Sequence, residues 1–539
     1  DPACGSGNFL IITYKELRRL EIRIWKRMTE LTGLRLLPYS NISINQFYGI
    51  ELDGFAHELA MLSLWLAEHQ MNAEFSRVFA DVKIDALPLK NINTIVQGNA
   101  CRVNWNEVCP HKPEEEVYVF GNPPYLGSGL QEIKHKEDMA LVFKIIKDYK
   151  KLDYISCWFY LASQYISDSS SCFSFVTTNS ICQGEQAPLL WQLIFKYNTE
   201  ISFAYKPFIW RNNAKHNAAV FVTIIGVRIK NKKSKYLYDN EVVNKVENIN
   251  SYLINYKDIF IFPKNKSIAK YPEMIKGSSP GDNGNLLLNQ MEKEKLETEH
   301  PESKEIIKKY YGADEFVNSK IRYCLWIEED KIDLAYSIPF IKSRLDKCEI
   351  FRSKSKKAAT RKKAATPYFF DERKYKKLPS IIVPQTGSEK REYLPLGILD
   401  KNCIISNAAR VIYNGNMLLL GLLISKIHMV WIRSIAGRLK NDMQYSNTLC
   451  YNTFPFPPLT EIKKREIEAL AEEVLLTRQH HTEKTLAQMY DPGKMPQDLH
   501  EAHHTLDLAV DSCYPGAPFK SDEERLEVLF KMYEKMVDK

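Results

Sequence analysis

Two short stretches hold residues whose types and spacing could do chemistry. The first is Asp1–Leu10, with the sequence DPACGSGNFL. Gly5 and Gly7 flank Ser6, so the backbone can turn tightly there and a ligand can come close to it. The apolar run Phe9–Ile12 then begins a helix whose first N–H groups face that turn. This stretch therefore predicts a strand end that turns into a helix beside a bound ligand.

The second stretch is GNPPY, at Gly121–Tyr125. Proline has no N–H and a fixed φ, so Pro123 and Pro124 stiffen a loop that has free carbonyl oxygens. Asn122 adds a side-chain acceptor, and Tyr125 adds an aromatic face. The loop therefore predicts a rigid set of hydrogen-bond acceptors beside a flat ring.

Together these stretches resemble motif I and motif IV of the amino-methylating DNA methyltransferases, which use S-adenosylmethionine. More narrowly, most of the chain is similar to the methyltransferase and specificity half of the MmeI-like (type IIG/IIL) restriction–modification enzymes. Five further stretches look like that family: GSSPGDNGN (Gly277–Asn285), RYCLW (Arg322–Trp326), YNTFPFP (Tyr451–Pro457), MYDP (Met489–Pro492) and AHHTLDLAVD (Ala502–Asp511).

The resemblance implies that the second stretch, including Pro124, is catalytic. The exocyclic N6 of adenine is a poor nucleophile because its lone pair is delocalised into the ring. The two hydrogens of this amino group would donate hydrogen bonds to the Asn122 side-chain oxygen and the Pro123 carbonyl. These bonds would free the lone pair to attack a sulfonium methyl group. The base must leave the duplex first, and Tyr125 can stack on it. A second aromatic wall is expected at Trp210 or Phe208, and the resemblance favours Trp210.

The resemblance also implies S-adenosylmethionine as the cofactor. Glu51 ends a predicted strand, where an acid can accept hydrogen bonds from both ribose hydroxyls. Asn99 stands where the family usually has an acid or an amide that reads the adenine of the cofactor, whereas Asp53 is expected on the surface. The full set of expected cofactor-binding residues is Asp1, Ala3, Gly5, Gly7, Asn8, Glu51 and Asn99.

Alternating strands and helices must position these residues, which predicts an α/β, doubly wound, Rossmann-like domain. Ligands of such sheets lie at the carboxyl ends of the strands, and Asp1, Glu51, Asn99 and Asn122 all fall at such ends. The expected strands are Phe47–Leu52, Thr94–Gly98, Val117–Phe120, Cys172–Thr177, Ile201–Tyr205 and Ala218–Val227. The expected helices are Phe9–Thr32, Ala56–Glu68 and Ala140–Ile166.

The composition changes after about Arg228, where lysine, asparagine and tyrosine rise and the alternation breaks. The resemblance implies three domains: a methyltransferase domain without its first strand (1–228), a mixed α/β target-recognition domain (229–452) and a C-terminal helical domain (453–539). The C-terminal helices are predicted over Glu461–Gln488, Asp498–Cys513 and near Ser521–Val537.

A basic segment, Lys342–Lys363, and a net charge of +8 fit double-stranded DNA as the partner. The alternative interpretation of this segment is a disordered, solvated basic loop. Contacts to DNA phosphates are expected from Lys356, Lys357, Arg361, Lys362 and Lys363.

The rest of the composition argues against other classes of protein. The eleven cysteines form no CxxC pair, so a reduced cytoplasm fits better than a disulfide framework, and no metal site is predicted. The longest apolar run, Met417–Ile424, is far shorter than the roughly 20 residues of a membrane helix. We expect a cytoplasmic, nucleoid-associated monomer. Because Asp1 already lies inside a motif, we expect a longer native chain. The resemblance implies that this longer chain carries an N-terminal nuclease and a helical spacer.

Three alternatives stay open. The target could be RNA or a protein glutamine, although some 220 residues of extra domain argue for DNA. The chain could bind DNA without methylating it. The methylated atom could be N4 of cytosine in place of N6 of adenine.

Several other residues are not expected to take part in the chemistry. Cys109–Pro110 and Cys182–Gln183 do not form the Pro-Cys-Gln nucleophile of cytosine-C5 methylation. His480–His481 and His503–His504 are expected on the surface. Tyr310–Tyr311 is expected to pack rather than to stack on bases.

Overall fold

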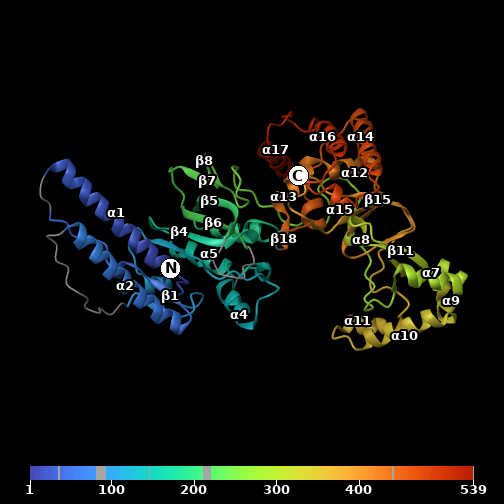
Figure 1. Cartoon of the computed structure of the whole chain (residues 1–539), viewed down its shortest axis with the longest axis horizontal. Helices are drawn as coiled ribbons and strands as arrows, with labels where there is room; N and C mark the ends of the chain where they lie inside the picture. Colours follow the sequence, from blue (N-terminus) through green and yellow to red (C-terminus); the bar gives the residue numbers. More distant parts are fainter. Residues whose placement is uncertain (34–36, 80–92, 145, 211–219, 440–441, 538–539) are drawn as a thin grey trace. The chain divides into compact units, whose positions relative to one another are not determined.

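A computed structural model describes residues 1–33, 37–79, 93–144, 146–210, 220–439 and 442–537. The chain forms two compact units, Asp1–Phe260 and Ile261–Lys539. In Figure 1 the first unit runs from blue to green and the second from green to red.

The first unit contains two groups of paired strands. β1 (Gly49–Glu51) and β2 (Ile95–Gln97) pair in parallel. A six-stranded sheet has the order β3-β4-β6-β5-β7-β8, in which β3 and β4 are parallel and β6 is antiparallel to both of its neighbours. Its strands are β3 (Tyr118–Gly121), β4 (Cys172–Thr178), β5 (Thr199–Trp210), β6 (Val220–Ile229), β7 (Lys235–Asp239) and β8 (Val242–Val246). The predicted α/β class is confirmed, and every predicted strand of this unit is present.

Two long helices, α1 (Asn8–Thr32) and α2 (Gly54–Val78), pack side by side next to β1 (Figure 1). Their buried faces carry Leu10 and Tyr14 from α1 and Ala60 and Leu64 from α2. Tyr14 also meets Phe47 edge to face, with ring centroids 5.4 Å apart. The helical period of the apolar residues therefore predicted α1 correctly, whereas the helix predicted over Ala56–Glu68 is present but continues to Val78. The shorter helices of the unit are α3 (Trp105–Val108), α4 (Ile133–Val142), α5 (Ser156–Tyr165) and α6 (Gln186–Phe195).

The prediction that Ala140–Ile166 is largely helical is confirmed, but the segment is not one continuous helix. The chain leaves α4 at Val142, passes through a short 3₁₀ helix at Tyr149–Lys151 and enters α5 at Ser156. Asp148 lies between them in the left-handed region, with φ 64°, which a continuous helix excludes. Leu152 and Ile155 are buried without being helical, so the apolar pattern continues across a break in the backbone.

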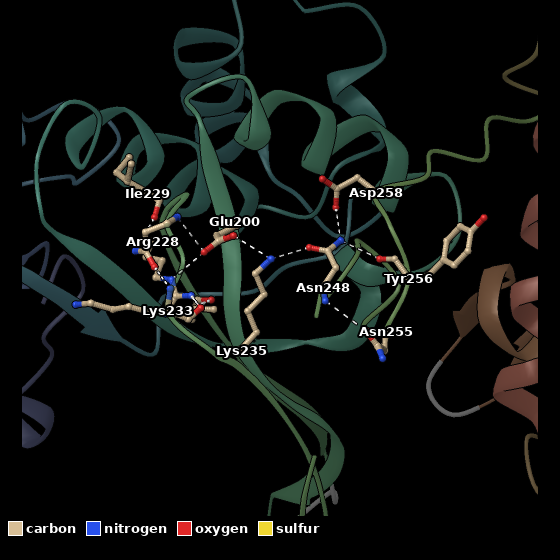
Figure 2. Close-up of polar contacts among 12 residues, drawn as sticks. Glu200, Arg228, Ile229, Lys233, Lys235, Asn248, Asn255, Tyr256 and Asp258 are labelled. Atoms are coloured by element: carbon tan, nitrogen blue, oxygen red, sulfur yellow. Dashed lines mark hydrogen bonds and ion pairs between the residues drawn. The ribbon is translucent and has the colours of Figure 1, made fainter. Parts of the chain in front are cut away.

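A buried carboxylate holds the far strands of the six-stranded sheet together, as Figure 2 shows. Glu200 of β5 lies 2.9 Å from Arg228 of β6 and 2.9 Å from Lys235 of β7. Lys235 in turn donates to Asn248, whose amide donates to the Asp258 carboxylate at 3.2 Å. The network therefore ties three strands to the segment that ends the first unit.

The second unit is mixed α/β in its first part. Two four-stranded sheets have the orders β10-β12-β11-β16 and β15-β13-β17-β9, and a three-stranded sheet has the order β14-β19-β18. Tyr310 is buried in the core between the first of these sheets and the neighbouring helices, and Tyr311 packs against a second core, so their predicted packing role is confirmed. The strands are β9 (Met274–Lys276), β10 (Leu287–Leu288), β11 (Ile307–Tyr311), β12 (Tyr323–Leu325), β13 (Ser380–Pro384), β14 (Thr386–Gly387), β15 (Gly397–Leu399), β16 (Cys403–Ile405), β17 (Ala409–Tyr413), β18 (Gly437–Leu439) and β19 (Asp442–Gln444).

Helices dominate the second unit after residue 416. α12 is buried along nearly its whole length, and α14 and α16 pack together beside it. α14 ends at Gln479, so the helix predicted to continue to Gln488 is too long. The helices of the unit are α7 (Gln290–Glu299), α8 (Ala313–Val317), α9 (Ile332–Ser337), α10 (Pro339–Ser353), α11 (Ala358–Lys362), α12 (Met417–Ile424), α13 (Lys426–Ile435), α14 (Glu461–Gln479), α15 (Leu486–Met489), α16 (Gln497–Asp511) and α17 (Asp522–Val537).

In the part of the chain that the structure describes, no single helix is long and apolar enough to cross a membrane. One pair, α12 with α13, meets the criteria of length and composition jointly, but the two helices are bent by 57°.

The prediction that His503 lies on the surface is wrong. Its ring is buried, stacks on Tyr393 at 4.1 Å between centroids, and has Nε2 2.7 Å from the Tyr490 hydroxyl. The helical period places His503 on the same face of α16 as the buried Leu506, whereas His504 is exposed as predicted. Burial lowers the pKa of His503 well below its usual value, so its ring is neutral.

Candidate functional site

The glycine turn has the conformation that its sequence predicts. Gly5 and Gly7 both adopt the left-handed region, with φ of 53° and 84°. A Cβ on Gly7 would lie 3.3 Å from the Ala60 side chain, so glycine also permits the close approach of α1 to α2. A Cβ on Gly5 would meet nothing within 4 Å. The turn is therefore open on the side of Gly5 and tightly packed on the side of Gly7.

Glu51, at the carboxyl end of β1, is tied to this turn. One carboxylate oxygen accepts from the Gly5 N–H at 2.8 Å and the other from the Asp53 N–H at 2.9 Å. A carboxylate has about four acceptor positions, so each oxygen keeps room for another donor. Asp53 is exposed and caps α2 by accepting from the Ala56 N–H, which confirms its predicted surface position.

Asp1 joins the glycine turn to the second stretch. Its Oδ1 accepts from the Ala3 N–H at 3.0 Å, whereas its buried Oδ2 has no hydrogen-bond partner among the described residues. A Cβ on Gly121 would lie 2.4 Å from Asp1 Oδ1, so only glycine fits there. Trp158, which sequence reasoning missed, holds this segment by donating to the Pro2 carbonyl at 3.0 Å. The two stretches are therefore in contact.

The residues after Gly121 alternate between exposed and buried. Asn122 and Pro124 are exposed, Pro123 is buried and Tyr125 is half-buried. Within the described part of the chain, no hydrogen bond engages the Asn122 side chain. The predicted acceptor is therefore available to a ligand.

Two side chains that sequence reasoning missed fix the end of this loop. Asp153 accepts from the Leu126 N–H at 2.7 Å, and Gln131 donates to the Leu126 carbonyl at 3.1 Å. Both side chains are buried, and burial raises the pKa of Asp153. Asp153 lies three residues before α5 and also accepts from the Ile155 N–H, but its bond to Leu126 crosses 27 residues and has no local signal in the sequence.

Asn99 follows β2 and points toward another missed residue. Its amide nitrogen donates to the Asp138 carboxylate at 2.9 Å, and its oxygen accepts from the Cys101 N–H at 2.9 Å. Burial raises the pKa of Asp138, but hydrogen bonds from Asn99, Arg102 and Tyr154 outweigh it and leave that pKa below its usual value. Direct contact between Asn99 and a cofactor stays a prediction.

The two aromatic candidates lie near the end of β5. Phe208 is half-buried and Trp210 is 41% exposed, with ring centroids 6.3 Å apart. The pairing of β5 with β6 shifts register between Tyr205 and Phe208, which marks a bulge or irregularity. Bulges re-aim side chains near functional sites. The residues after Trp210 in the same stretch, 211–219, lie outside the described residues.

The basic segment is ordered rather than a disordered loop. It covers most of α10 and all of α11, and Lys356, Lys357, Arg361 and Lys362 are exposed. Lys363 differs because its ammonium lies 3.0 Å from the Asp371 carboxylate. Arg352 is buried and donates to five backbone carbonyls, those of Pro280, Gly281, Lys363, Thr366 and Phe369. Thus part of the positive charge in this segment holds the fold, whereas Lys356, Lys357, Arg361 and Lys362 face solvent together with Lys342, Lys347 and Lys354.

Comparisons with known proteins agree over the full chain. Residues 1–239 match a family model described as MmeI, DNA-methyltransferase domain, residues 255–458 match MmeI, target recognition domain, and residues 459–539 match MmeI, C-terminal domain. DNA methyltransferase A of Bacillus subtilis (strain 168) is 46% identical over 540 residues, a match that covers 100% of this chain and 61% of the relative. This chain thus spans under two thirds of that relative's length.

Two further similarities differ in extent. A solved structure of the type IIL restriction–modification enzyme MmeI in complex with DNA superimposes with a TM-score of 0.89 and 36% identity, covering 100% of this chain and 73% of that one. A putative type II restriction enzyme and methyltransferase of Methanocaldococcus jannaschii is 42% identical over 67 residues, 12% of this chain and 6% of the relative.

Proposed function

Because this chain belongs to the MmeI family of restriction–modification enzymes, we propose that it is a site-specific DNA methyltransferase. It transfers a methyl group from S-adenosylmethionine to N6 of adenine in double-stranded DNA. The observation that carries the proposal is the close approach of Asp1 to Gly121, which joins the glycine turn to the Asn122–Tyr125 loop. A cofactor held at the glycine turn would lie beside a base held at the Asn122–Tyr125 loop.

The residues at the glycine turn fit the proposed cofactor. S-adenosylmethionine, when bound, supplies an electrophilic methyl group on a sulfonium. The open side of Gly5 lets a ligand approach the backbone, and Glu51 has acceptor capacity left for ribose hydroxyls. The unpartnered Asp1 Oδ2 is a further acceptor in this region. Ala3, Gly7 and Asn8 complete the proposed cofactor-binding set, and Asn99 belongs to it directly or through Asp138.

The Asn122–Tyr125 loop performs the chemistry in this proposal. The Asn122 side-chain oxygen and the Pro123 carbonyl accept the two hydrogens of the target amine, which frees its lone pair. Pro124 keeps the loop rigid, so the acceptors need not reorganise during the reaction. Tyr125 stacks on the flipped base, with Trp210, or else Phe208, on its other face.

The proposed division of labour follows the predicted domains. Residues 1–228 form the methyltransferase domain, 229–452 read the DNA sequence and 453–539 form a helical domain. Exposed cations at Lys356, Lys357, Arg361 and Lys362 contact DNA phosphates, and Lys363 contributes less because Asp371 already pairs with it.

Transfer of tritium from labelled S-adenosylmethionine tests the proposed function. Duplex DNA, RNA and total protein should be offered in parallel, each with the chain and with its Asn122→Ala variant. We expect label in duplex DNA alone, and none with the variant. Label in RNA or in protein glutamine would replace the proposed substrate, and label in DNA from the variant would remove Asn122 from the mechanism.

A further inference from the structure

The buried carboxylate of Asp138, on α4, gathers three hydrogen-bond donors. Asp138 is 3% exposed. One of its oxygens accepts from Arg102 Nε at 2.6 Å, and the other accepts from the Asn99 amide at 2.9 Å and from the Tyr154 hydroxyl at 2.8 Å. Burial raises the pKa of this carboxyl, but the three hydrogen bonds outweigh burial and leave the pKa below its usual value. The group is therefore ionised and can only accept.

The Asn99 amide is fixed from two sides. Its nitrogen donates to Asp138, and its oxygen accepts from the Cys101 backbone N–H at 2.9 Å. A carboxylate can only accept, and a backbone N–H can only donate. An amide that was turned over would therefore face an acceptor with its oxygen and a donor with its nitrogen. The two partners thus leave one orientation for the amide.

Asn99 keeps half of its hydrogen-bonding capacity for a ligand. An amide has two N–H donors and two acceptor positions on its oxygen, and the described residues use one of each. The side chain is half-buried rather than enclosed. One donor and one acceptor on a planar group match an edge of adenine, which carries an amine donor beside a ring-nitrogen acceptor.

Asn99 also stands next to the acid that is proposed to hold the ribose. β1 and β2 pair with Glu51 opposite Gln97, and the N–H of the next residue, Gly98, donates to the Glu51 carbonyl at 2.8 Å. Asn99 follows directly. A nucleoside whose ribose is held at Glu51 would therefore have its base close to Asn99.

We propose that Asp138 is a positioning residue for cofactor recognition. It holds the Asn99 amide so that one N–H and the oxygen together face the adenine of S-adenosylmethionine. The inference rests on the proposed function, which supplies the cofactor. It also gives a physical reason for an amide rather than an acid at position 99. A carboxylate there would face the Asp138 carboxylate at hydrogen-bond distance, where like charges repel.

Reciprocal substitution tests the pairing of these two side chains. Asn99→Asp should weaken the binding of S-adenosylhomocysteine by about tenfold or more, because two carboxylates then face each other. Adding Asp138→Asn restores one amide and one carboxylate, so the double variant should recover most of the lost affinity. Calorimetry measures the affinities, and circular dichroism reports whether each variant is folded. The double variant has no facing carboxylates, so it carries the test even if Asn99→Asp alone does not fold.

The choice of base is a second readout, which a merely structural residue would not change. The unchanged chain should bind S-adenosylhomocysteine about tenfold or more tightly than S-inosylhomocysteine, in which an oxygen replaces the amine. Asp138→Ala should narrow this preference, because the Asn99 amide loses one of the two contacts that fix it. Tyr154→Phe is the matched control: it removes a different donor to Asp138, leaves both contacts of Asn99 in place and should keep the preference.

Three results would overturn the inference alone, provided that the unchanged chain binds S-adenosylhomocysteine. They are an unchanged affinity in Asn99→Asp, no recovery in a folded double variant, and the same preference between the two compounds in Asp138→Ala as in Tyr154→Phe. If the unchanged chain bound neither compound, the proposed function would fall together with the inference.

Discussion

At the scale of single residues, some side chains of the candidate site are fixed by hydrogen bonds, whereas others have no hydrogen-bond partner in the described part of the chain. Glu51 is held by the Gly5 and Asp53 N–H groups, whereas Asn122 is exposed and, in the described part of the chain, bonded to nothing. A held acid suits a cofactor that must always lie in one place. A free acceptor suits a base that arrives only when DNA is bound.

Glu51 gives the first prediction. Replacing it by alanine should weaken S-adenosylmethionine binding by roughly 1–3 kcal/mol, because charge-assisted hydrogen bonds are lost. Glu51→Gln keeps an acceptor for the Gly5 N–H and should lose less. Isothermal calorimetry of both variants measures the difference, and an unchanged affinity in Glu51→Ala would take this acid out of the site.

At the scale of elements, Asp153 gives the second prediction because it joins the segment before α5 to the end of the Asn122–Tyr125 loop. Asp153→Ala leaves the Leu126 N–H without its acceptor, so the loop should loosen. Methyl transfer should slow while S-adenosylmethionine affinity stays the same, since Asp153 does not touch the glycine turn. Asp153→Asn retains one acceptor and serves as the control. Equal rates in all three proteins would show that the bond to Leu126 does not position the loop.

A buried acid on α16 predicts that the stability of the second unit depends on pH. Burial raises the pKa of Asp507 from 3.8 to about 7, although hydrogen bonds from the Lys426 N–H and the Tyr393 hydroxyl lower it in part. A raised pKa favours the protonated form in the folded state, so this stabilising contribution is complete below about pH 4 and is lost as the pH rises to about 7.

The third prediction follows from the direction in which stability changes as Asp507 ionises. Between pH 5 and 8 the melting temperature of the chain should fall more steeply than that of Asp507→Asn, which cannot ionise. Thermal unfolding at matched ionic strength measures both slopes. Parallel slopes would mean that Asp507 does not titrate in this range.

Local sequence predicted most of the elements and the positions of the site residues within them. The sequence predicts apolar strands that end near the polar residues Glu51, Asn99 and Asn122. In the structure, each of these residues lies at the end of a strand or just after it. Contacts between distant residues were not predictable: nothing near Asp153 indicates Leu126, and nothing near Asn99 indicates Asp138. The break after Val142 was missed because no proline or glycine marks it.

At the scale of the whole molecule, we propose that catalysis and recognition belong to different parts of one chain, and the basic segment lies in the second unit. Replacing Lys356, Lys357, Arg361 and Lys362 by neutral residues should weaken binding to all duplexes about equally. The slope of log affinity against log salt should fall by about 0.9 for each phosphate that the variant no longer neutralises.

Fluorescence anisotropy across a salt series, on specific and random duplexes, measures this effect. Lys363→Gln is the matched control, because that ammonium already pairs with Asp371 and its removal should change the slope less. An unchanged slope in the fourfold variant would assign these cations to solvent.

The central claim is that the Asn122–Tyr125 loop directs a methyl group to N6 of adenine in DNA. The most direct measurement is mass spectrometry of nucleosides from duplex DNA incubated with S-adenosylmethionine and the chain, with Asn122→Ala in parallel. We predict N6-methyldeoxyadenosine with the chain and no methylated nucleoside with the variant, while both proteins bind DNA equally. N4-methyldeoxycytidine, or N6-methyldeoxyadenosine formed by the variant at the full rate, would contradict the account.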